Sequence, residues 1–197
     1  MTFANTVSRK LIALAAATAA FGLATFAHAE SDITTAAAGA ISASARLDFR
    51  ITVPKIIFLQ VGTGTAFSDV GTIDRVDMTL TNANVTSGGA VAAAAGVTAR
   101  VLGNGGAVSL NANGTSGGLS NGAGQSIAWT QVTSASTNAS LPHPVIGNGA
   151  NGATSTLAAT LGVVNQTATW TFGFSNSLGT IASGTYNGQV VYTAALP

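Results

Sequence analysis

A long period-two alternation near the N-terminus constrains the fold of this chain most. The odd-numbered residues from Ile33 to Val53 are mostly apolar, whereas the even-numbered residues from Ser42 to Thr52 are polar or charged. Successive side chains of a β-strand point to opposite faces, so this pattern predicts extended strand. At about 3.3 Å per residue the alternation would extend about 70 Å, several times the length of an ordinary strand. We therefore expect it to serve more than one sheet neighbour.

Shorter strand signals recur through the rest of the chain. Pro54 interrupts the alternation, and Ile56 to Val61 is expected as a short buried strand before a turn at 62–64. Two expected strands, 97–101 and 108–112, flank Gly103-Asn104-Gly105-Gly106 and are predicted to form a hairpin. The other expected strands are 76–80, 127–129, 168–174 and 190–196.

The remaining segments favour loops and a single fold class. Residues 111–125 and 133–152 are rich in Gly, Asn and Ser and are expected as loops. Only 154–164 has weak helical character. No fixed-period repeat is present, which argues against a solenoid. We expect an all-β domain of the sandwich type.

The first residues have the layout of a secretory signal peptide. Arg9 and Lys10 precede an uncharged run from Leu11 to Phe26, and small residues follow at 27–29. The alternative is a retained membrane anchor, but the run is shorter than the roughly 20 apolar residues that span a bilayer. We predict cleavage after Ala29 and export of the mature chain.

The charge composition excludes several classes of partner. Charged residues make up 7% of the chain, and none follows Arg100. Nucleic acid and anionic membrane surfaces are bound through clustered Lys and Arg, and no such cluster exists in the mature sequence. Cysteine is absent, so stability must come from packing, sheet hydrogen bonds or association with other chains.

Residues able to carry out catalysis or bind metal are scarce. His143 is flanked by Pro142 and Pro144 and is expected to be a solvated loop residue. A calcium site at Asp69, Asp74 and Asp77 is less favoured than a solvated turn, because these residues lack the EF-hand ligand pattern. The glycine pattern at 147–152 has no acidic residue downstream, which argues against a dinucleotide site. We predict no enzyme activity, no catalytic residues, no metal and no cofactor.

The aromatic residues allow two interpretations. Trp129, Trp170, Tyr186 and Tyr192 would suit a face that stacks on sugars. Alternating aromatic residues on a strand are more often core, and we favour that interpretation for Trp170, Phe172 and Phe174.

Three segments resemble chaperone-usher fimbrial subunits, in particular the alpha-class, colonisation-factor type of major pilin without cysteines. One segment is the alternating Ile33 to Val53 running into Pro54-Lys55-Ile56-Ile57-Phe58-Leu59-Gln60-Val61-Gly62. Another is Ser126-Ile127-Ala128-Trp129. The third, Gly184-Thr185-Tyr186-Asn187-Gly188-Gln189-Val190-Val191-Tyr192, is similar to the Gly-x-Tyr-x-Gly-x-Val ending of such pilins.

The resemblance implies an immunoglobulin-like sandwich, here 46–197, that lacks one strand, which the N-terminal extension of a neighbouring subunit supplies. The extension would be 30–45, with Leu47 to Val53 as the subunit's own first strand. Implied partners are copies of the chain, a periplasmic chaperone and an outer-membrane usher, in a fibre for adhesion or biofilm formation whose receptor is unknown. The implied donor residues are Ile33, Ala37, Gly39, Ile41, Ala43 and Ala45. The implied groove-bordering residues are Val190, Tyr192, Ala194 and Leu196.

The residues leave a second function open. A stand-alone secreted or cell-surface module that binds carbohydrate or matrix would share the export signal and the β-rich fold. The two readings differ over residues 30–45, which only a fibre subunit needs in order to assemble.

Overall fold

The computed structural model of the chain describes residues 30–64, 67, 71, 73–175 and 181–197. The predicted signal peptide and Asp69 lie outside these residues. Contacts divide the chain into two units, 1–52 and 53–197, and the helices and strands formed by the described residues lie in the second. The elements are β1 (Ile57–Val61), α2 (Asn82–Ser87), β2 (Val91–Ala92), β3 (Val97–Gly103), β4 (Val108–Gly114), β5 (Leu119–Ser120), β6 (Ser126–Ile127), η1 (Trp129–Gln131), β7 (Val132–Ser136), β8 (Ile146–Asn148), β9 (Ser155–Leu157), β10 (Val164–Phe174) and β11 (Val190–Ala195).

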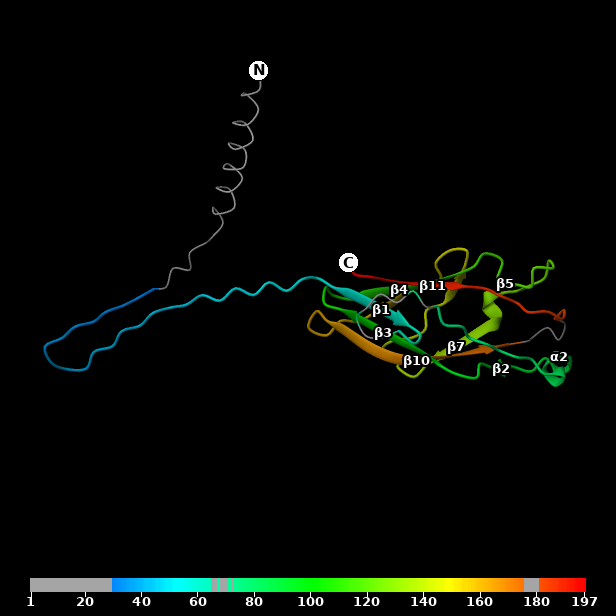
Figure 1. Cartoon of the computed structure of the whole chain (residues 1–197), viewed down its shortest axis with the longest axis horizontal. Coiled ribbons are helices and arrows are strands. Elements are labelled where there is room, and N and C mark those ends of the chain that lie inside the picture. The colour runs from blue at the N-terminus through cyan, green and yellow to red at the C-terminus, as the bar shows by residue number, and fades with distance from the viewer. Residues whose placement is uncertain (1–29, 65–66, 68–70, 72, 176–180) are drawn as a thin grey trace, which may run out of the picture. The chain divides into compact units, whose positions relative to one another are not determined.

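The fold is all-β and sandwich-like, as the sequence predicted. One sheet has the order β1-β3-β10-β2, with β7 also pairing with β10. The second has the order β11-β4-β8, with β9 also pairing with β4, and β5 and β6 form a small separate ladder. Figure 1 shows β3 and β10 in one layer and β4 and β11 in the other. In the described residues no helix has the length and apolar character needed to cross a bilayer.

The core lies where the alternating strands of the two sheets face each other. On β10 the even-numbered Val164, Ala168, Trp170 and Phe174 are buried, because every second side chain of a strand points inward. Trp170 is completely buried and donates from Nε1 to the carbonyl oxygen of Leu141 at 3.1 Å. The core interpretation of the aromatic residues on this strand is therefore confirmed for Trp170 and Phe174, and Phe172 packs against the same cluster while partly exposed.

The expected hairpin between 97–101 and 108–112 is wrong. These residues lie in β3 and β4, which belong to different sheets. β3 is paired on its two edges by β1 and β10, and β4 is paired by β11 on one side and by β8 and β9 on the other. Neither strand has an edge left for the other, so the Gly-rich connection carries the chain from one sheet to the other.

Several local expectations also differ from the structure. No strand covers 76–80, and the expected helix at 154–164 is replaced by β9 and a turn in which Leu161 has a φ of 52°. The segments 111–125 and 133–152 contain parts of β4 and β7 as well as β5 and β8. Gly, Ser and Asn have low strand propensity, but ladder pairing with a long central strand outweighs that preference.

The short helix α2 was not expected from periodicity. Thr81 begins it with a capping box, in which Asn84 N–H donates to Thr81 Oγ1 and Thr81 N–H donates to Asn84 Oδ1. Gly88 ends it in the left-handed conformation, with φ of 71°. A helix this short is defined by its caps and not by a hydrophobic stripe.

Trp129 is held between two glycines from distant parts of the chain. Its Nε1 donates to the carbonyl oxygen of Thr115 at 2.8 Å. A Cβ at Gly114 would meet the indole Cε2 and Nε1, and a Cβ at Gly188 would lie 2.9 Å from Cη2 and Cζ2. The indole therefore fills the space that side chains at these two positions would need.

We expect Gly188→Ala to lower the free energy of unfolding by about 1–3 kcal/mol, because the added methyl overpacks the indole. Urea denaturation of the purified chain measures this difference. Gly71→Ala is the control, since a Cβ at Gly71 meets nothing within 4 Å. Equal effects of the two substitutions would contradict the packing described for Trp129.

Candidate functional site: two strand edges and an exposed apolar segment

β1 lies at one edge of its sheet, and its register shows which of its backbone groups do not pair with β3. Gly62 N–H donates to Thr98 O at 2.7 Å, and Asn104 N–H donates to Ile56 O at 3.3 Å. The backbone N–H and C=O groups of the even-numbered residues of β1 therefore point toward β3, because backbone groups alternate in direction along an antiparallel pair. The N–H and C=O groups of Ile57, Leu59 and Val61 point to the opposite edge.

β11 occupies the corresponding edge of the other sheet. Thr115 N–H donates to Gln189 O at 2.9 Å, and the ladder with β4 continues from Val190↔Gly114 to Ala195↔Ser109. The backbone N–H and C=O groups of the odd-numbered residues of β11 thus point toward β4. The backbone groups of Val190, Tyr192 and Ala194 point away from β4, and β11 has no second ladder within the described residues.

The two edges lie together and carry half-buried apolar side chains. Cα atoms of β1 and β11 approach within 8 Å, but no ladder joins the strands. Neighbouring strands lie about 4.8 Å apart, so a strand inserted between them needs about 9.6 Å and would have to separate them. We call these facing strands the β1/β11 edge. Its partly buried apolar side chains, which pack against the core, are Leu59, Val61, Tyr192, Ala194 and Leu196.

The expected strand at 190–196 is present as β11, and the groove-bordering role of its residues stays a prediction. Val190, Tyr192, Ala194 and Leu196 share the inner face of the strand and are all partly exposed. The strand expected at Ile56 to Val61 is present as β1, but the expectation that it is buried is wrong, because β1 lies at a sheet edge and its side chains are exposed or partly exposed. Its contribution to the β1/β11 edge was not predicted. The sequence did contain a signal for it, namely a short apolar strand directly after the long alternation, because the first strand of a domain can lie at the edge of a sheet.

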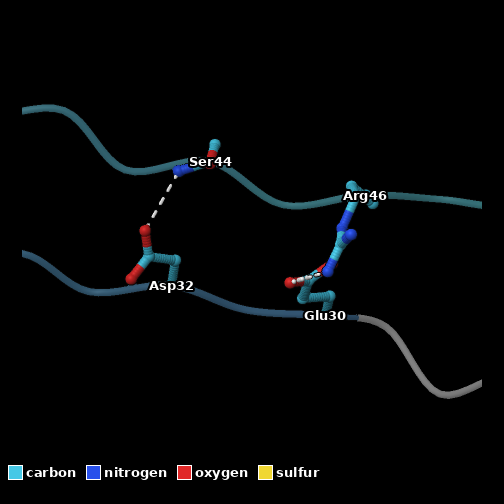
Figure 2. Close-up of polar contacts among 4 residues, drawn as sticks. All are labelled: Glu30, Asp32, Ser44 and Arg46. Atoms are coloured by element: carbon cyan, nitrogen blue, oxygen red, sulfur yellow. Dashed lines mark hydrogen bonds and ion pairs between the residues drawn. The ribbon is translucent and has the colours of Figure 1, made fainter.

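The predicted donor residues lie in a segment that folds back on itself. Figure 2 shows Arg46 beside Glu30, with Nε to Oε2 at 2.6 Å and Nη2 to Oε1 at 2.9 Å, and Ser44 N–H donating to Asp32 Oδ2 at 3.3 Å. Thr34 Oγ1 donates to Ser42 O at 3.0 Å. The Arg46 guanidinium lowers the pKa of the Glu30 carboxyl. All these pairs are centred on residue 38, so the segment turns where Ala37 and Gly39 bend the chain and Gly39 has a φ of 100°.

Residues 30–56 contain no assigned strand, so the long continuous strand expected there is absent from the single chain. A strand needs a neighbour for its backbone groups, and the alternation of side chains does not supply one. Ile33 is 88% exposed and Ile41 55%, and Ala37, Gly39, Ala43 and Ala45 are also exposed. The segment 47–53, expected as the domain's first strand, is likewise unpaired, and the first strand is β1.

The largest exposed apolar side chains lie at 47–53. Leu47, Phe49, Ile51 and Val53 are 65–86% exposed, and they alternate with Asp48, Arg50 and Thr52. Isolated exposed apolar residues are ordinary, but four at strand spacing are a feature that marks an interaction site. We call this stretch the apolar segment.

Parts of the three segments quoted for the pilin resemblance contact one another. Gly188 packs against Trp129, and Ser120 and Asn187 exchange backbone hydrogen bonds of 2.9 Å. β1, from the first quoted segment, contacts β11, from the third. These contacts lie within the unit 53–197, whereas Ile33 to Thr52 of the first quoted segment belong to the other unit.

His143 lies inside the unit 53–197 and not in solvent, which corrects the expectation of a solvated loop residue. Its ring packs edge-on against Trp170, Phe172 and Tyr192, with centroids 4.8, 5.0 and 5.6 Å away. Nε2 lies 2.8 Å from the Tyr192 hydroxyl, and Nδ1 lies 3.0 Å from Ser134 Oγ. Burial lowers the pKa of His143 to about 4 and raises the pKa of Tyr192. The histidine is therefore a neutral bridge between β7 and β11.

We expect the chain to lose stability as the pH falls from 6.5 to about 4. The unfolded chain binds a proton at His143 near pH 6.5, whereas the folded chain binds it only at about pH 4. Stability is complete above pH 6.5, and the loss reaches about 2–3 kcal/mol near pH 4. Urea midpoints measured across this range test the expectation. His143→Phe should flatten the slope between pH 6.5 and 4, and an unchanged slope would contradict the assignment.

The described acidic residues make local contacts. Asp74 accepts from Thr63 N–H at 2.6 Å and from Thr63 Oγ1 at 2.9 Å, which fixes the turn after β1. Asp77 pairs with Arg75 at 2.9 Å. In the described ranges no group of three or more His, Cys, Asp or Glu side chains is placed to hold a metal ion.

The two tryptophans considered for a sugar-stacking face are buried. Trp170 is fully buried, and Trp129 is 7% exposed. Tyr192 has its hydroxyl on His143, and Tyr186 donates to the carbonyl oxygen of Ala182 at 2.9 Å. A sugar ring needs the open face of an aromatic side chain, and neither tryptophan offers one.

Comparisons with known proteins do not place the chain in a family. No protein-family model matches it, and the searches of curated proteins and of solved structures found no match. The geometry of the β1/β11 edge and the apolar segment is therefore the ground on which a function is proposed.

Proposed function

We propose that the chain is a structural subunit of an extracellular fibre, a fimbria or pilus assembled by donor-strand exchange. The observation that carries the proposal is that one chain has an apolar strand edge and an alternating apolar segment, neither of which pairs with another strand among the described residues. Exposed strand edges template pairing with other chains, so such an edge needs a cover. A strand added from another copy would pair the free backbone groups of the edge and would bury the apolar side chains of the segment.

In this proposal the sandwich is immunoglobulin-like and incomplete, with the donated strand at the β1/β11 edge. A periplasmic chaperone covers the edge before assembly. At an outer-membrane usher the donor strand of the next subunit then replaces the chaperone. The fibre then supports adhesion or biofilm formation. The resemblance of the three quoted segments to chaperone-usher subunits supports these partners.

The apolar segment suits the donor role better than Ile33 to Ala45. Fully burying a large apolar side chain contributes about 1.5–3 kcal/mol, so four contribute about 6–12 kcal/mol. The earlier segment offers two isoleucines among small residues, or about half as much. Seven extended residues span about 23 Å, close to the roughly 20 Å of the six-residue β11.

Truncation and peptide rescue test the proposal. A chain starting at Val53 should remain monomeric or aggregate, and a peptide with the sequence of residues 46–53 should bind it and raise its Tm. A peptide of residues 33–45 is the comparison, and binding of that peptide alone would move the donor role to Ile33–Ala45. A truncated chain that is a stable monomer indifferent to both peptides would overturn the fibre proposal in favour of a stand-alone binding module.

A further inference from the structure

The side chain of Asn104 contacts the three residues between the apolar segment and β1, Pro54–Ile56. Its Oδ1 accepts from Ile56 N–H at 2.7 Å, and its Nδ2 donates to Pro54 O at 2.7 Å. Its own backbone N–H donates to Ile56 O at 3.3 Å. These contacts extend the β1–β3 register beyond Ile57↔Gly103, so Pro54–Ile56 continues in line with β1.

A second contact fixes the same residues. Lys55 Nζ donates to the carbonyl oxygen of Pro197, the residue that follows the end of β11 by two positions. The Lys55 side chain also lies over Gly105, where a Cβ would meet it. The linker is thus attached to the β3–β4 connection and to the chain after β11.

A free linker of this length would permit a competing structure. Three-residue loops commonly connect hairpins, so residues 54–56 could reverse the chain and lay the apolar segment on its own β1. The register would pair Val53, Ile51 and Phe49 with Ile57, Leu59 and Val61. Those β1 residues have the unpaired backbone groups, and Leu59 and Val61 pack against the core. A self-covered monomer is therefore compatible with the register of the backbone groups of β1.

We infer that Asn104 is a positioning residue that keeps Pro54–Ile56 from forming this turn and so directs the apolar segment to a second copy of the chain. The inference rests on the proposed function, since it concerns whether the apolar segment covers the β1/β11 edge of its own chain or that of a second copy. The proposed occupant is a second copy, because Pro54–Ile56 held in line with β1 do not form the turn that a hairpin with the same β1 needs.

Disulfide trapping tests the inference, because the chain has no cysteine of its own. In the self-covered hairpin Arg50 and Gln60 lie directly opposite each other as a non-hydrogen-bonded pair, which suits disulfide geometry. The mature chain carrying Arg50→Cys and Gln60→Cys is oxidised at low protein concentration. The internal disulfide is quantified on non-reducing gels, and polymer yield is measured in parallel on chains without the cysteines.

Asn104→Ala in the double-cysteine chain should raise the fraction with an internal disulfide about tenfold, because two side-chain hydrogen bonds that hold the linker are lost. Asn104→Ala without the cysteines should give fewer polymers and more folded monomer. Asn165→Ala, at an exposed position on β10 opposite Leu102, is the matched control and should change neither quantity.

The outcomes separate the inference from the proposed function. Normal polymers with no gain of internal disulfide in Asn104→Ala would overturn the role of Asn104 and leave the fibre proposal standing. A loss of polymer without internal disulfide would show Asn104 to be merely structural, which also overturns the inference. Absence of polymer from the unsubstituted chain in the presence of the chaperone and usher would overturn both.

Discussion

Ile51→Asp is expected to abolish polymer formation while leaving the folded domain unchanged. Ile51 is 86% exposed in the single chain, so a carboxylate there remains in water and costs the monomer little. In a polymer the same carboxylate would enter the apolar β1/β11 edge of the next copy, where an unpaired buried charge costs several kcal/mol. Size-exclusion chromatography and electron microscopy measure assembly, and circular dichroism and Tm report the fold.

Ile33→Asp is the matched control, because Ile33 is similarly exposed but lies in the folded-back segment. That variant should still form polymers if the apolar segment is the donor. Loss of assembly in Ile33→Asp or Ile41→Asp, with normal assembly in Ile51→Asp, would assign the donor role to Ile33–Ala45. Normal assembly of all three variants would contradict strand exchange through either segment.

Trp170→Ala is expected to lower the free energy of unfolding by about 3–5 kcal/mol, the range for truncating a buried aromatic residue. The indole is completely buried, and its removal would also leave the Leu141 carbonyl without its indole donor. His143 and Tyr192 lose an aromatic neighbour as well, so the inner face of β11 should loosen. Denaturant unfolding at pH 7 measures the change.

The control for this substitution is Val191→Ala, on the outward face of β11, where the side chain is 57% exposed. Its effect should lie within about 0.5 kcal/mol. If Trp170→Ala cost less than about 1 kcal/mol, the packing of the two sheets around this residue would be wrong. An additional fall in binding of the 46–53 peptide is expected, because β11 forms one side of the site.

The parts of the candidate site that depend only on the alternation of side chains could be predicted from the sequence. The alternation from Val190 to Leu196 identified the inner face of β11 because strand side chains alternate whatever they pair with. The alternation before Pro54 identified a segment able to line a sheet. It did not show that 47–53 is exposed and forms no strand, because exposure and strand formation depend on which neighbours the tertiary structure supplies.

Asn104 and His143 show what could not be predicted. Asn104 stands in a Gly-rich stretch that suggested an ordinary hairpin, and its role appears only when Pro54 and Ile56 are placed beside it, 50 and 48 residues away in sequence. His143 has no apolar pattern around it, and its burial comes from Trp170, Phe172 and Tyr192 on two other strands. Long-range neighbours of this kind leave no local signal in a single sequence.

The sequence by itself determined the all-β class and the strands β1, β10 and β11, because period-two patterning and β-branched and aromatic residues act locally. Only the tertiary structure decided that β3 and β4 lie in different sheets, that β7 and β8 form from Ser- and Gly-rich segments, and that β1 and β11 share an unpaired edge. Those outcomes depend on which backbone edges remain free after the central strands have paired. Edge pairing is a property of the assembled sheets, and it decides where a second chain is able to bind.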